Sequence, residues 1–158
     1  MSDNIQSDDR QVGLEQAWHG KTIVVPEVTF DQAFPFQFIQ APVFLEIDGK
    51  MVAHGRWYVP IGSDTLRPVG NGQALNQDSY KLKPPQEIWN FMLEMTKGTK
   101  AKVVSAGTVG NRALYFVSME LEEIQEAKFE DGSVMKIFFN GLDSCNKVIN
   151  HQLGISGT

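Results

Sequence analysis

Short runs of apolar residues recur along the chain, and several of them end in a residue pair suited to a tight turn. Asp-Gly and Gly-Asn pairs tolerate the positive φ angles that a short hairpin turn requires. Strands that are joined by such turns run antiparallel. The predicted strands are residues 43–47 and 51–59 around Asp48-Gly49, residues 102–108 and 112–119 around Gly110-Asn111, and residues 134–139 after Asp131-Gly132.

One segment follows a helical period instead. Its apolar positions, at spacings i, i+3, i+4 and i+7, are Ile88, Phe91, Met92 and Met95. Pro84-Pro85 suits a first helical turn and Gly98 suits a stop, so we predict a helix from about residue 85 to about residue 97. The element order is then hairpin, helix, hairpin and strand. This order predicts an α+β fold, an antiparallel sheet built from hairpins with one main helix packed on it.

The segments outside these elements set the domain limits. Residues 1–16 lack an apolar period and carry many acidic residues, so we predict a flexible acidic tail followed by a single α+β domain over residues 17–158. Residues 22–28 are split by Pro26, which permits only a short or edge strand. Residues 62–83 are rich in Gly, Pro, Asn and Ser, and connections of that length are often functional or disordered.

Three phenylalanines alternate with other residues in the segment before the first hairpin. If this segment is extended, Phe34, Phe36 and Phe38 lie on one side of it. The stripe is either part of the core or a stacking surface. An exposed stripe, together with unpaired sheet edges, would favour self-association.

Composition places the protein among ordinary globular domains. It has 158 residues, of which 42% are hydrophobic and 21% charged, and no apolar run approaches the ~20 residues that a membrane-spanning helix needs. The first ten residues are acidic and polar, unlike a secretory signal, so we expect a cytoplasmic protein. The lone Cys145 has no partner for an internal disulfide, which agrees with a reducing compartment.

Net charge narrows the class of nucleic-acid partner. A formal charge of −5 argues against a protein that coats duplex DNA, but a local basic groove is still allowed. Cations also stand beside aromatic residues on predicted strands, as in sheets on which single-stranded bases stack. The alternative is that the lysines are solvated and the rings are core. The candidate nucleic-acid-binding residues are Arg56, Trp57, Lys81, Lys83, Lys97, Lys100, Lys102, Arg112 and Tyr115.

Catalytic and metal-binding patterns are weak. His19, His54 and His151 are far apart, and none belongs to a paired-ligand motif, so we expect neither a metal nor a cofactor. Cys145 follows a carboxylate rather than a base, which indicates a buried structural cysteine. Residues 107–112 are glycine-rich but lack the lysine of a phosphate-binding loop. We therefore predict a protein that is not an enzyme.

Several stretches resemble a known family. Ala17-Trp18-His19-Gly20 with residues 22–26, Tyr80-Lys81-Leu82, residues 107–116 and residues 139–144 are similar to the phage/plasmid-like proteins catalogued as domain of unknown function 932. The resemblance covers residues 17–158 and implies a mobile-element origin, a bacterial host and no settled activity. Members of that family look longer, so the chain is expected to be either a shortened relative or an N-terminal piece.

Two functional hypotheses follow, in order of preference. The first is a non-enzymatic protein that binds single-stranded nucleic acid in recombination or replication, based on the sheet, the Arg-aromatic pairs and the lysines around the helix. The second is a phage-encoded protein that binds a host protein, as a counter-defence factor or replication modulator, based on its acidic charge and predicted tail. A third, enzymatic reading would require Cys145, His151 and an acid to meet.

Overall fold

The protein is mostly antiparallel sheet with few helices, an α+β-like arrangement. The computed structural model describes residues 5–121, 127–128, 134–145 and 152–157. A six-stranded sheet has the order β11-β10-β7-β6-β1-β2 and a second sheet the order β3-β4-β5, and β8 pairs with β9. The strands are β1 (Gln11–Gly13), β2 (Ile23–Val24), β3 (Phe38–Ile47), β4 (Lys50–Gly62), β5 (Leu75–Asn76), β6 (Lys102–Val109), β7 (Leu114–Glu120), β8 (Ala127–Lys128), β9 (Val134–Met135), β10 (Ile137–Ser144) and β11 (Gln152–Gly157).

The first two predicted hairpins are confirmed, and their turns have the expected backbone. Asp48 and Gly49 between β3 and β4 have φ values of 51° and 76°. Gly110 and Asn111 between β6 and β7 have φ values of 65° and 58°. The predicted third strand appears as β9 and β10, whereas the turn at residues 131–132 lies outside the described residues.

Helix α2 (Pro85–Met95) matches the predicted helix, and Pro85 opens it. It contacts β7 and β10, with Ile88 and Met92 fully buried. Gly141 in β10 makes room for the helix, because a Cβ there would lie 2.7 Å from Met92 Sδ. The buried face is rotated from the predicted one: Trp89 is buried, while Met95 is exposed. The apolar face is therefore centred one residue away from the expected stripe.

The N-terminal segment is part of the fold, which corrects the prediction of a flexible tail over residues 1–16. Strand β1 pairs antiparallel with β6 and parallel with β2, and Val12 within it is fully buried. Residues 1–4 lie outside the described part of the chain. The expected edge strand before Pro26 is confirmed as β2, the last strand of the sheet. The domain boundary at residue 17 is wrong because three residues of strand carry too little pattern to be recognised.

The phenylalanine stripe belongs to the core. Phe34 and Phe36 are buried, and Phe38 stacks on the fully buried Tyr115 with 5.8 Å between the ring centroids. A short helix that the sequence did not suggest, α1 (Phe30–Ala33), precedes the stripe and begins with a capping box between Thr29 and Gln32. The stripe therefore provides no surface for self-association.

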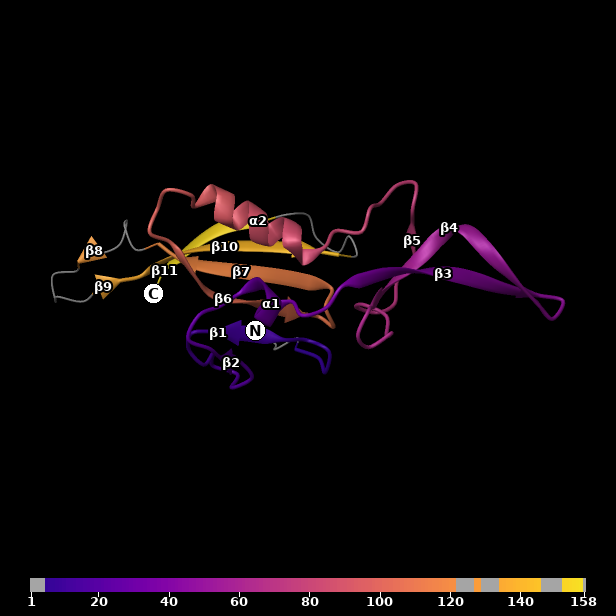
Figure 1. Ribbon diagram of the computed structural model, residues 1–158, viewed down its shortest axis with the longest axis horizontal. Coiled ribbons are helices and arrows are strands. Elements are labelled where there is room, and N and C mark those ends of the chain that lie inside the picture. Colours follow the sequence, from indigo (N-terminus) through magenta and orange to yellow (C-terminus); the bar gives the residue numbers. More distant parts are fainter. Residues whose placement is uncertain (1–4, 122–126, 129–133, 146–151, 158) are drawn as a thin grey trace.

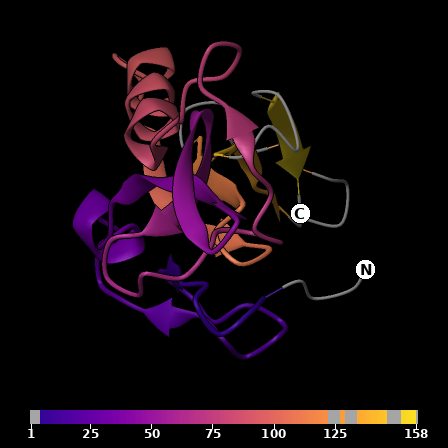
Figure 2. The ribbon, with the colours of Figure 1, turned by 90° about the vertical axis from the view of Figure 1, so that its right-hand side faces the viewer.

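The β3-β4 hairpin extends beyond the six-stranded sheet. Figure 1 shows its outer part projecting to one side of the body, and Figure 2 looks almost along it, with α2 and the six-stranded sheet behind. The long segment of residues 62–83 turns back at the base of the hairpin, where it forms β5 and a bridge between Ile61 and Pro68. None of the helices in the described ranges is long and apolar enough to cross a membrane.

Candidate functional site

The outer part of the β3-β4 hairpin, residues 43–54, is termed the arm here. Its pairs are fixed by the register, in which Leu45 faces Val52 and Phe44 faces Ala53. Side chains that are directly paired across two strands share a face. One face, termed the aliphatic face, consists of Val43, Leu45, Ile47 and Val52, with Lys50 at the tip and His54 at the base. The opposite face consists of Phe44, Met51, Ala53 and Glu46.

Both faces of the arm are open to solvent. Phe44, Leu45, Ile47, Met51 and Val52 each keep between 46% and 65% of their surface exposed. An antiparallel hairpin with one buried face normally alternates apolar and polar residues, whereas strands covered on both faces read as continuous apolar runs. The strands of the arm are continuous apolar runs, yet no other element covers either face of them in the described residues. Exposed apolar patches of this kind mark contact surfaces for other molecules.

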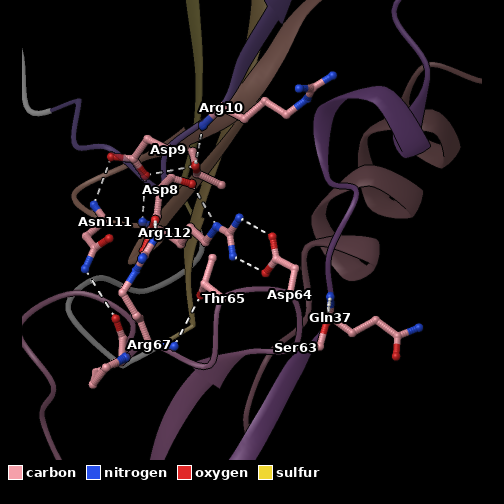
Figure 3. Close-up of polar contacts among 12 residues, drawn as sticks. Asp8, Asp9, Arg10, Gln37, Ser63, Asp64, Thr65, Arg67, Asn111 and Arg112 are labelled. Atoms are coloured by element: carbon pink, nitrogen blue, oxygen red, sulfur yellow. Dashed lines mark hydrogen bonds and ion pairs between the residues drawn. The ribbon is translucent and has the colours of Figure 1, made fainter.

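A polar cluster, termed the clasp, joins the inner end of the β3-β4 hairpin, opposite the arm, to the body (Figure 3). Its central residue is Arg112, whose guanidinium donates to the two carboxylate oxygens of Asp64 at 2.7 and 2.9 Å. The same guanidinium donates to the Asp8 carbonyl at 2.8 Å and lies 4.0 Å from the centroid of the Phe36 ring. Since Asp64 follows β4 and Arg112 precedes β7, this ion pair joins the two sheets.

The N-terminal segment completes the clasp. The Asp9 carboxylate accepts hydrogen bonds from the Thr108 hydroxyl at 2.9 Å and from the backbone N–H groups of Asn111 and Arg112 at 2.9 and 2.6 Å. Asp8 forms an ion pair with Arg67. The clasp therefore consists of Asp8, Asp9, Asp64, Arg67, Asn111 and Arg112, from three distant parts of the chain.

The clasp also sets the protonation of its acids. The hydrogen bond from Arg67 holds the pKa of Asp8 below its usual value, and the hydrogen bond from Arg112 does the same for Asp64. Both carboxylates are therefore ionised at neutral pH, where their pairs are intact. Every charge in the cluster has a partner on the protein, which indicates a structural role in joining the hairpin to the body rather than a reaction centre.

A second candidate surface is a hollow of about 360 Å³ on the other face of the six-stranded sheet from α2. Val117 pairs with Gly141, which lies under α2, so Val117 is on the face of the sheet that α2 covers. Its neighbour in β7, Phe116, therefore points to the opposite face. Phe116 and Phe138 line the hollow with two cations and two acids. The charged residues are Lys102, Lys136, Glu15 and Glu120, and Lys136 Nζ lies 4.0 Å from Glu120 Oε1.

Two of the residues predicted to bind nucleic acid are inside the protein. Arg112 is buried in the clasp, and Tyr115 is fully buried and donates from its hydroxyl to the Lys83 carbonyl at 2.7 Å. Burial raises the pKa of Tyr115 well above its usual value. Neither side chain is available for stacking on a base, which corrects that part of the prediction. They were misplaced because neighbouring strand residues face opposite ways, and here the buried face takes the tyrosine.

The other predicted residues are spread over the surface. Arg56 is exposed beside Asp78, at 3.8 Å, and Trp57 is 39% exposed with its ring edge against His54. Both lie at the base of the arm, in β4. Lys81 is exposed and Lys83 is half-buried, before α2. Lys97, Lys100 and Lys102 follow α2, and Figure 1 places that end of the helix on the opposite side of the body from the arm. The fold does not gather these residues into one groove.

Cys145 is confirmed as a buried residue. It is fully enclosed, and burial raises the pKa of its thiol to about 12, so it carries no thiolate at neutral pH. His151, the base that the enzymatic reading requires, lies outside the described residues. In the part of the chain that the structure describes, no three His, Cys, Asp or Glu side chains lie together in a way that could hold a metal ion.

The arm was missed as a site because its sequence also describes an ordinary core hairpin. A signal was nevertheless present: Val43-Phe44-Leu45 and Met51-Val52-Ala53 flank an Asp-Gly turn, and Glu46 and Lys50 are the only polar strand residues between Val43 and Ala53. No protein-family model matches the chain, and no curated protein or solved structure matches it either. The resemblance to phage/plasmid-like proteins stays a prediction.

Proposed function

We propose that this chain is a non-enzymatic protein-binding module whose contact element is the arm. The observation that supports the proposal is the apolar surface on both faces of the outer part of a hairpin whose inner end the clasp joins to the body. Aliphatic and aromatic side chains of this kind form the centre of protein-protein interfaces, where charged residues are depleted. Among the two functions expected from the sequence, this favours the binding of a protein.

The charges of the arm fit a protein partner better than a nucleic acid. Glu46 and Asp48 balance Lys50 and Arg56, so the hairpin and its base carry no net excess of positive charge. Single-strand binding proteins combine stacking rings with a positively charged groove along the backbone. The only predicted Arg-aromatic pair that stays at the surface, Arg56-Trp57, has its cation beside Asp78.

The proposal is tested by chemical cross-linking in cells that produce the protein. We expect adducts that contain the protein, whether with itself or with another chain, and we expect them to disappear in a Phe44→Ser, Met51→Ser double variant. Ile155→Ser is the control, because Ile155 is a still more exposed apolar residue on β11, away from the arm. Adducts that persist in the double variant, or that are lost equally in the control, would count against the arm.

A second candidate function is single-strand binding at the hollow. It is favoured by one observation, the presence of Phe116 and Phe138 with Lys102 and Lys136 around the same depression. Two acids share that lining and weaken the attraction for phosphate. Titration of a fluorescent oligothymidine in about 50 mM and about 200 mM salt tests it. Micromolar binding that weakens with salt and with Phe116→Ala supports it, and no binding in low salt rejects it.

A further inference from the structure

We propose that the partner of the arm is the arm of a second copy of this chain, paired along the free edge of β3 around a two-fold axis. The inference rests on the proposed function, because it names the occupant of the same surface. It uses three observations on the arm: the open edge of β3, the balance of charges along each strand, and the amount of exposed apolar surface.

The first observation is the edge. Strand β3 is the outer strand of the β3-β4-β5 sheet, and β5 pairs only with Trp57 and Tyr58 of β4. Within the described residues, the arm is therefore a two-stranded ribbon. An isolated two-stranded hairpin is marginally stable in water, whereas four strands with an apolar face form a stable sheet. Exposed apolar edge strands pair readily with another chain unless charges or prolines protect them. From Val43 to Ile47, β3 has only Glu46 as protection.

The second observation is the charge pattern, which is compatible with the pairing of two β3 edges. An antiparallel pairing of two β4 edges centred on Ala53 would place Lys50 opposite Arg56 of the other copy, and like charges in that position are destabilising. Two β3 edges centred on Leu45 avoid this conflict. In that register Leu45 faces its own counterpart, Val43 faces Ile47, and Phe44 faces Glu46. No like charges are opposed, so the β3 edge is complementary to itself.

The third observation is the apolar surface. The five exposed side chains of the arm leave on the order of 500 Å² of surface open per copy, divided between its two faces. In the paired arrangement, the aliphatic faces of the two arms form one continuous surface. Val43, Leu45 and Ile47 of each copy then have apolar neighbours across the new strand pair, while Val52 keeps Leu45 of its own copy as its neighbour.

The molar mass of the full chain in solution tests this inference, measured by light scattering between about 1 and about 100 µM. We expect the wild type to form a dimer. Leu45→Lys places two cations directly opposite each other on the two-fold axis, and we expect at least a tenfold rise in the dimer dissociation constant. Val52→Lys is the matched control, since it changes the same face on the strand that does not pair, and it should remain dimeric.

A mixing experiment distinguishes a loss of dimerisation from a loss of folding in the Leu45 variants. Leu45→Lys and Leu45→Glu should each be monomeric, and their equimolar mixture should recover a dimer, which a misfolded variant cannot do. A wild type that is monomeric at about 100 µM overturns the inference, and so does a Val52→Lys variant that dissociates as readily as Leu45→Lys. If the wild type is monomeric but arm-dependent adducts with other proteins form in cells, the proposed function stands and only the second copy is excluded.

Discussion

Replacing Asp9 with alanine tests whether the N-terminal segment is a structural part of the protein. The Asp9 carboxylate accepts three hydrogen bonds, from the Thr108 hydroxyl and from the backbone N–H groups of Asn111 and Arg112. Asn111 and Arg112 have φ values of 58° and 67°, a left-handed conformation that needs support from its surroundings in residues other than glycine. Alanine removes the acceptor and leaves both backbone groups without it.

The expected loss follows from these three bonds. A hydrogen bond to a charged group contributes about 1.5–3 kcal/mol when it is well buried. Asp9 is half-buried, so water replaces part of each bond, and about 1 kcal/mol per bond is the appropriate estimate. The variant should lose about 3 kcal/mol of unfolding free energy, which corresponds to a decrease of about 6–12 °C in Tm for a chain of this length.

Urea and thermal denaturation followed by circular dichroism measure both quantities. Glu94→Ala is the control, because Glu94 is an exposed carboxylate on α2 and its removal should change the unfolding free energy by less than about 0.5 kcal/mol. A flexible tail, as the sequence alone predicts for residues 1–16, would give the same small effect for Asp9→Ala. A change below about 0.5 kcal/mol in Asp9→Ala would therefore refute the reasoning from the clasp.

Three further measurements address other parts of the structure. The hydrogen bond from Arg112 lowers the pKa of Asp64 below its usual value of 3.8, so this ion pair contributes stability above about pH 4 that is lost as the pH falls through the lower, folded-state pKa. Acid should therefore destabilise the wild type more steeply than Asp64→Asn. Urea midpoints of the two proteins that stay parallel between about pH 5 and pH 2 would contradict this. Cys145 should react with a maleimide at neutral pH at least ~100-fold more slowly in the folded protein than in urea, and equal rates would show that it is accessible. Gly141→Ala should cost about 1–3 kcal/mol because its Cβ meets α2, whereas Gly154→Ala, with open space around it, should cost less than about 0.5 kcal/mol; equal melting temperatures would exclude the close approach.

The elements that could be predicted from the sequence are those specified by neighbouring residues. Asp48-Gly49 determines a tight turn whatever surrounds it, and Pro85 and Gly98 mark the two ends of α2. Strand β1 could not be found in this way. Its three residues form a strand because β6 lies beside them, and that pairing joins Gln11 to Gly107. Contacts between such distant segments leave no periodic pattern in the local sequence.

The candidate site was harder to predict than the fold. Arg112 carries the same charge whether it faces solvent or a carboxylate, and only the chain path shows that Asp64 lies within hydrogen-bonding distance. The arm shows the opposite case. Leu45 and Val52 have the composition of a core pair, but the ribbon to which they belong extends beyond the elements that would cover them. The hydrophobic pattern of a sequence predicts which residues are buried. It does not show whether they are buried inside the same chain or against another molecule.

The route of the clasp through the chain has a consequence for biosynthesis. Asp8 and Asp9 leave the ribosome roughly a hundred residues before Arg112, while the arm needs only its own two strands and a two-residue turn. On a nascent chain, both strands of the apolar hairpin are therefore synthesised well before Arg112, whose ion pair with Asp64 joins the hairpin to the body. A translation product that stops before Arg112 carries the whole arm with its exposed apolar side chains, but it lacks the Arg112–Asp64 pair that joins the hairpin to the body.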